Sequence, residues 1–158
     1  MENVHNTHIL AQYRDFHLAL LEIVAVMSRP QRDEALIRAA GIRLDRALFP
    51  LVVVIERFGP IGIVDLADRI GRDHTTVSRQ VAKLETLGLV VREADPSDRR
   101  VRRAAIAPEG KAMTDRIDRA REQLGLAVFA DWEERDFDDL VRLMGKFAAS
   151  FRDVPERP

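Results

Sequence analysis

The chain contains no cysteine, so disulfide bonds, thiolate zinc sites and thiol-based redox sensing are excluded. Long apolar runs are also missing. The longest, from Ala47 to Ile55, is interrupted by Pro50 and is far shorter than a membrane span. The N-terminus lacks the basic and then apolar pattern of a secretory signal. We therefore expect a cytoplasmic protein with no membrane partner.

Aromatic residues are scarce, at 6% of the 158 residues. The sequence is nevertheless 46% hydrophobic and 32% charged, which is typical of a folded globular protein rather than a disordered one. Helix-forming residues such as alanine, leucine, arginine and glutamate dominate. The composition therefore predicts a mainly α-helical chain, with one compact domain or one domain and a second lobe.

The formal net charge of −1 hides an uneven distribution. Residues 69–103 hold nine basic and five acidic residues, a local charge of +4, whereas the rest of the chain has a charge of −5. A basic segment in an acidic body is the electrostatic pattern expected of a nucleic-acid contact. The four histidines show no metal-ligand spacing, and we expect no metal and no cofactor.

Apolar residues recur at helical spacing in most of the chain, and proline and glycine residues divide the segments. Pro50 lies inside one apolar segment, so that helix either begins near Pro50 or is kinked there. Two short runs around a polar turn, 95–98, have the pattern of a β-hairpin. We expect helices over 7–29, 33–40, 44–58, 63–71, 74–88, 108–131 and 136–151, and strands over 89–94 and 101–106.

The segment 74–88 has the pattern of a DNA-recognition helix. Asp73 is a suitable N-cap, and Val77, Val81 and Leu84 fall on one side when residues advance by about 100° each. The opposite side is small, hydroxylated and basic, and its one carboxylate is Glu85. Such a face suits close approach to a major groove, where arginine pairs with guanine and lysine neutralises phosphate. The predicted contacts are Thr75, Thr76, Ser78, Arg79, Gln80 and Lys83, with Gln80 nearest the core side.

The hairpin that follows is basic at its turn, which predicts the wing of a winged helix-turn-helix. An arginine at such a turn can enter a narrow minor groove, and Asp98 could orient Arg100 there. A basic edge strand protected from aggregation is the alternative interpretation. The predicted wing contacts are Asp98, Arg99, Arg100 and Arg102.

The sequence resembles the MarR family of bacterial transcription regulators between residues 44 and 112. The residues that carry the resemblance are Gly59-Pro60, Val64 to Ala67, His74 to Val81, Leu84 to Val90, Asp95 to Arg100, and Glu109-Gly110. The family usually has Leu-Thr before the helix that follows the wing, whereas this chain has Ile106-Ala107 and then Pro108. Because proline is compatible with a first helical turn, the helix is still expected.

The resemblance implies a homodimer with one DNA-binding lobe per subunit. The winged helix-turn-helix would occupy 44–107, and the helical regions 1–43 and 108–158 would form the dimer. Such a dimer binds double-stranded DNA at a pseudo-palindromic operator, with recognition helices about 34 Å apart. Independently, the terminal helices carry more apolar side chains than a small lobe can bury, although these could also pack on the helix at 44–58. The predicted interface residues are Ile9, Tyr13, Phe137, Val141, Met144, Phe147 and Phe151.

Family members commonly respond to small aromatic or phenolic molecules, so the resemblance also implies a repressor that is released by a small effector. Tyr13, Phe16, His17 and Phe49 are candidates to line such a site, but each is more simply interpreted as a core residue. No catalytic motif supports an enzyme. A winged-helix module that binds proteins instead of DNA is the alternative, and the four arginines of the wing argue against it.

Overall fold

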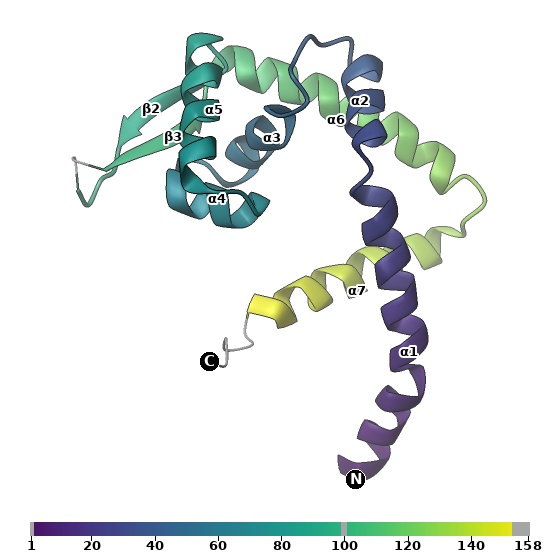
Figure 1. Cartoon of the computed structure of the whole chain (residues 1–158). Coiled ribbons are helices and arrows are strands. Elements are labelled where there is room, and N and C mark those ends of the chain that lie inside the picture. Colours follow the sequence, from purple (N-terminus) through teal and green to yellow (C-terminus); the bar gives the residue numbers. More distant parts are fainter. Residues whose placement is uncertain (1, 99–100, 153–158) are drawn as a thin grey trace. The chain divides into compact units, whose positions relative to one another are not determined.

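The computed structural model describes residues 2–98 and 101–152, which contain seven helices and three strands (Figure 1). The chain divides into two compact units, residues 1–119 and 120–158, and the boundary falls within a helix. All predicted helices and both predicted strands are confirmed, with shifted ends. The elements are α1 (Glu2–Met27), α2 (Pro30–Ala39), α3 (Phe49–Phe58), β1 (Ile61–Gly62), α4 (Ile63–Ile70), α5 (His74–Thr86), β2 (Val90–Ala94), β3 (Arg102–Ile106), α6 (Pro108–Val128) and α7 (Glu134–Arg152).

Prolines set two of the helix starts. Pro50 does not kink a long helix, because α3 begins at Phe49 and Pro50 occupies its first turn. The expected helix at 33–40 begins earlier, at Pro30, again with proline in the first turn. The fixed φ of proline suits a first turn, where its missing N–H would have no helical acceptor. The nine residues from 40 to 48 therefore connect α2 to α3 without a helix.

The core of the first unit lies between α3, α4, α5, the sheet and the first half of α6. Leu51 and Val52 of α3 and Leu66 of α4 are fully buried, as is Ile117 of α6. Burial of a large aliphatic side chain stabilises the fold by about 1.5–3 kcal/mol. In Figure 1, α3, α4 and α5 lie together beside the β2–β3 hairpin. The helix-turn-helix is thus held by one continuous apolar core.

The sheet contains a strand that the sequence pattern did not predict. β1 has two residues, and it pairs antiparallel with β3 through Ile61 opposite Ala104. The strand order is β1-β3-β2, so β3 is the central strand. Val90 pairs with Ile106 at the base of the hairpin. A two-residue strand is too short to give an alternating pattern, and only its partner makes it visible.

α6 begins in close contact with the base of the wing. The N–H of Ala107 donates to the carbonyl of Leu89 at 3.0 Å. A Cβ on Gly110 would lie 2.0 Å from that same carbonyl oxygen. Thr114 is buried and its hydroxyl donates to the carbonyl of Lys111 at 2.9 Å. Only glycine fits where the first turn of α6 meets Leu89.

α1 exposes apolar side chains along its length. Leu10 is 73% exposed. Tyr13, which is a predicted interface residue and had a core position as its other interpretation, is 55% exposed and so does not lie in the core of the chain. Phe16 is also exposed, whereas Phe49 is buried, as expected for a core residue. The Tyr13 ring lies 6.0 Å from that of Phe16 and stacks on the His17 ring at 6.3 Å. The structure therefore brings Tyr13, Phe16 and His17 together on one surface of α1.

The second unit consists of the end of α6, a turn and α7. Aromatic rings pack at this turn, with Phe129 4.8 Å from Phe137 and 5.2 Å from Trp132. Phe137, Val141 and Met144 are nevertheless 40%, 57% and 47% exposed. Of the remaining predicted interface residues, Ile9 is exposed, Phe147 is half-buried, and the side chain of Phe151 lies outside the described part.

Candidate nucleic-acid interface

The N-terminus of α5 is fixed by the cap that the sequence predicts. The Asp73 carboxylate accepts from the N–H of Thr76 at 2.8 Å. Hydrogen bonds from the Thr76 side chain and then from its N–H hold the pKa of Asp73 below its ordinary value. Gly71, with a φ of 64°, ends α4 just before this cap. A left-handed glycine followed by a capping aspartate makes the tight turn that a helix-turn-helix needs.

The inward side of α5 is the predicted one, since Val77, Val81 and Leu84 are all 0% exposed. On the other side, Thr75, Arg79 and Lys83 are exposed. Thr76, Ser78 and Gln80 are half-buried on the two flanks.

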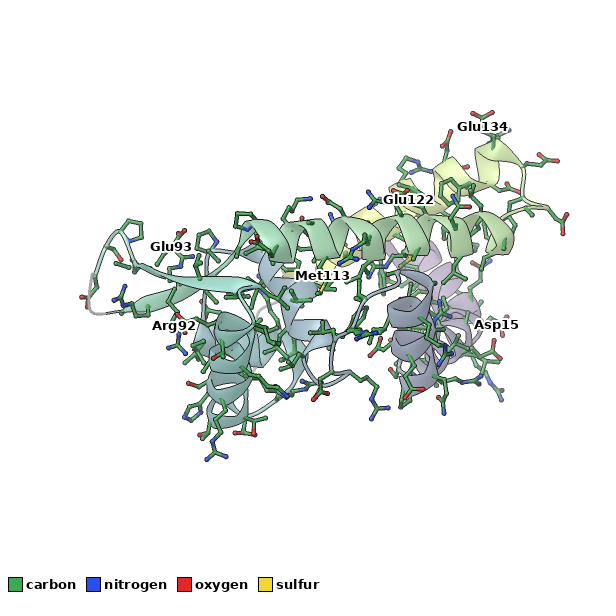
Figure 2. All side chains as sticks on the ribbon, turned by 90° about the horizontal axis from the view of Figure 1, so that it is seen from above. Asp15, Arg92, Glu93, Met113, Glu122 and Glu134 are labelled. Carbon is green, nitrogen blue, oxygen red and sulfur yellow. The ribbon has the colours of Figure 1, made fainter. Side chains whose placement is uncertain are left out.

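The acidic residue on this surface is neutralised within the chain. Arg92 of β2 donates from its Nε to the Glu85 carboxylate at 3.1 Å. Figure 2 shows Arg92 and Glu93 projecting to opposite sides of the wing, as neighbours on a strand do. Glu85 therefore does not leave an unpaired negative charge beside the exposed arginine and lysine of α5.

Lys83 has a partner from the loop before α3. Its Nζ lies 3.3 Å from Oδ2 of Asp45. The N–H of Ala47 donates to the other oxygen of Asp45 at 2.9 Å. This backbone hydrogen bond, followed by the one from Lys83, lowers the pKa of Asp45. The lysine that was predicted to meet phosphate is thus paired with a carboxylate in the DNA-free chain.

Gln80 is held on its core side, where its helical position places it. Arg72 donates from Nη1 to Oε1 of Gln80 at 3.2 Å. The same Nη1 donates to the carbonyl of Ala47 at 2.7 Å. The loop before α3 is therefore attached to α5 twice, through Lys83 and through Arg72.

The wing turn is organised by Asp95. Its Oδ1 accepts from the N–H of Ser97 at 2.8 Å and from the Ser97 hydroxyl at 2.5 Å. These two bonds, the hydroxyl first, lower the pKa of Asp95. Its Oδ2 lies 3.4 Å from Nη1 of Arg103 on β3. A carboxylate that accepts from residues two positions ahead is a common turn device, and here it also fixes a basic side chain.

Of the predicted wing contacts, Arg102 is exposed at the start of β3. Asp98 is half-buried, and its carbonyl accepts from the N–H of Val101 at 2.9 Å. Arg99 and Arg100 lie outside the described residues.

Asp45, Arg72 and Asp95 were not predicted from the sequence to shape this surface. A signal existed for Asp95, since Asp-Pro-Ser-Asp favours a turn with side-chain hydrogen bonds. No such signal existed for Asp45, whose partner Lys83 is 38 residues away, or for Arg72, whose partner Ala47 is 25 residues away.

Within the described residues, no group of three histidine, aspartate or glutamate side chains could hold a metal ion. No helix in that part is long and apolar enough to cross a membrane.

Comparisons with known proteins agree with this geometry. Residues 44–101 match the model of the MarR family. An uncharacterized HTH-type transcriptional regulator of Bacillus subtilis, YxaD, is 32% identical over 106 residues, which are 65% of this chain and 74% of that protein.

Solved structures share the fold. A MarR family protein from Bacillus stearothermophilus has a TM-score of 0.71 at 17% identity, with 90% of this chain and 97% of that chain covered. RV1404 from Mycobacterium tuberculosis has a TM-score of 0.66 at 19% identity, with 92% and 97% covered. At these identities the likeness shows the fold alone. The family match and the Bacillus relative establish that this chain belongs to the MarR family and is a DNA-binding transcriptional regulator, not an enzyme.

Proposed function

We propose that the protein is a homodimeric repressor that binds a pseudo-palindromic operator through α5 of each subunit and is released by a small, aromatic effector. The observation that carries the proposal is the outer face of α5. It exposes Thr75, Arg79 and Lys83, and its carboxylate, Glu85, is paired with Arg92. A face of hydroxyl and cationic groups can donate to base edges and phosphates without repulsion from an unpaired acid.

The wing would contact the DNA beside the recognition helix. Arg102 is exposed on β3, and the Asp95–Arg103 pair keeps the turn compact. Arg99 and Arg100 stay predicted contacts, with Asp98 as a support. An arginine at such a turn is attracted by the enhanced negative potential of a narrow minor groove.

Dimerisation is supported by the apolar surfaces of α1 and α7. The segment 18–27 of α1 has one charged residue, Glu22, and it exposes apolar side chains on more than one side of the helix, among them Leu18 and Ile23. A helical segment that is apolar on most sides is normally buried. Phe137, Val141 and Met144 recur at helical spacing on α7 and are exposed. Apolar surface of this extent marks a protein interface, and a second copy of the chain would bury it.

An aromatic group on α1 is the candidate contact for the effector. Tyr13, Phe16 and His17 form an aromatic group on α1, and aromatic groups accept planar ligands by offset stacking. A ligand that favours a spacing of the two recognition helices mismatched to the groove would lower DNA affinity.

The proposal is tested by isolating genomic fragments that the purified protein retains and by measuring the affinity of variants for the recovered site. Arg79→Ala should weaken specific binding by about 1–3 kcal/mol and relax the preference at one base pair. Arg116→Ala is the matched control, because it removes an exposed arginine from α6. Equal affinities of Arg79→Ala and the control would refute the assignment of α5 as the reading helix.

A further inference from the structure

Arg72 lies in the turn between α4 and α5 and has a fixed position there. Its N–H donates to the carbonyl of Ala67 at 3.0 Å, and the next residue, Asp73, caps α5. Its Nη1 lies between two acceptors, the Ala47 carbonyl at 2.7 Å and Oε1 of Gln80 at 3.2 Å. The side chain is half-buried. Backbone and guanidinium are therefore both anchored, and Gln80 is attached to this anchor.

The chemistry of the two side chains decides how Gln80 is oriented. A guanidinium carries donors and no acceptor, whereas a glutamine amide has one end of each kind. The end of Gln80 that faces Arg72 must therefore be the carbonyl oxygen, whichever way the amide would turn by itself. Among the described residues, the amide nitrogen of Gln80 has no hydrogen-bond partner. Gln80 is thus left with a donor.

This orientation changes what Gln80 can read on DNA. A free glutamine pairs with adenine through both ends, since it accepts from N6 and donates to N7. The carbonyl oxygen can accept two hydrogen bonds, but the one from Arg72 turns it toward the turn before α5, which draws this end of the amide away from a bidentate contact with adenine. The remaining amide donor suits guanine, which presents N7 and O6 as two acceptors side by side.

We propose that Arg72 is a positioning residue that determines base specificity, because it commits Gln80 to hydrogen-bond donation and so favours guanine over adenine at one operator position. The proposal depends on the proposed function, in which α5 lies in the major groove. Arg72 acts through Gln80 and needs no contact with DNA of its own.

The test measures relative affinities for a set of operators that carry each of the four bases at each position. The position read by Gln80 is the one where Gln80→Ala removes the preference. At this position wild-type protein should favour guanine, and Arg72→Met should raise the affinity for adenine relative to guanine by about fivefold or more, since a bidentate contact becomes available. The double variant Arg72→Met/Gln80→Ala should have the same base profile as Gln80→Ala. Arg69→Met, which removes an arginine held over the Phe58 ring of the same lobe, should leave the profile unchanged.

A ratio between bases separates specificity from folding, because a loosened turn would weaken all operators equally. A uniform loss in Arg72→Met, or a shift that persists in the double variant, would overturn the proposal. So would a Gln80→Ala variant that weakens every sequence to the same extent, which would place Gln80 on a phosphate.

Gln80→Glu tests the same point with Arg72 intact, because glutamate accepts from Arg72 but has no donor left. It should lose the guanine preference, and retention of that preference would contradict the proposal. A further outcome concerns the proposed function. If Arg79→Ala leaves operator binding unchanged, then α5 is not the reading helix, and a negative result with the Arg72 variants is explained by that rather than by the role of Arg72.

Discussion

Nζ of Lys83 lies 3.3 Å from Oδ2 of Asp45, so a cation of the DNA-recognition helix is paired with an acid from the loop before α3. Both side chains are about half exposed, at 58% and 52%. An exposed pair of this kind is weak and exchanges easily with another charged partner. In the proposed complex with DNA, a phosphate would therefore displace Asp45 before it pairs with Lys83.

Asp45→Asn should raise DNA affinity by up to about fivefold, which corresponds to the upper range for an exposed ion pair. The gain in affinity should be larger at low salt, because salt screens the attraction between the unpaired Lys83 ammonium and a phosphate. The measurement is a salt titration of operator binding by fluorescence anisotropy. Glu109→Gln, an equivalent charge change on α6, is the control and should have little effect. Unchanged or weaker binding by Asp45→Asn would show that Lys83 does not meet phosphate.

Asp73→Ala should lower the thermal midpoint by roughly 2–6 °C at neutral pH, because α5 loses its N-cap. The pKa of Asp73 is lowered in the folded chain by hydrogen bonds from Thr76, the side chain first. The carboxylate therefore adds stability above its unfolded pKa of about 4, and this contribution is lost as the pH falls below that value. Calorimetry at several pH values should show the difference from wild type shrinking in acid. Asp73→Asn should keep the cap without this pH dependence, and a constant difference in Asp73→Ala down to the most acidic pH would contradict the prediction.

Gly110→Ala should destabilise the first unit by about 1–3 kcal/mol, because its Cβ would lie 2.0 Å from the Leu89 carbonyl oxygen. The Leu89 carbonyl is backbone, and Cδ1 of Ile106 would lie 2.7 Å from the same Cβ, so little room is left for adjustment. Gly125→Ala is the matched control, since nothing lies within 4 Å of the added Cβ in the same helix. It should stabilise α6 by about 0.5–1 kcal/mol. Chemical denaturation followed by circular dichroism measures both, and equal effects of the two substitutions would be inconsistent with the contact at Leu89.

Val141→Asp should convert the proposed dimer to a monomer. Val141 is 57% exposed on α7, between Phe137 and Met144, and a carboxylate there would be buried without a partner in a dimer. Light scattering should give twice 17.9 kDa for the wild type and 17.9 kDa for the variant. Lys146→Asp places the same charge on an exposed polar position of α7 and should leave the mass unchanged. A dimeric Val141→Asp would exclude this face from the interface.

The sequence by itself determined the local structure of the helix-turn-helix and the wing. The spacing of Val77, Val81 and Leu84 predicts the buried side of α5. Asp73 is a residue type that favours the N-cap, and it stands directly before the first residue of α5. Both signals act within one or two turns of helix, where helical geometry alone decides which residues meet. The basic hairpin and the start of α6 at Pro108 are equally local.

Tertiary structure alone decided which of these groups are available to DNA. Lys83 is hydrogen-bonded to Asp45, Gln80 to Arg72, and Arg72 to the carbonyl of Ala47. The first of these bonds joins residues 38 positions apart, and the last joins residues 25 positions apart. β1 exists only because β3 pairs with it, and Gly110 is required only because Leu89 approaches it. Hydrogen bonds and close approaches between distant segments leave no periodic trace in a sequence. The exposed face of α5 could therefore be predicted as a surface. The partners of Lys83 and Gln80 follow only from the packing of the loop before α3 and of the turn between α4 and α5 against this helix.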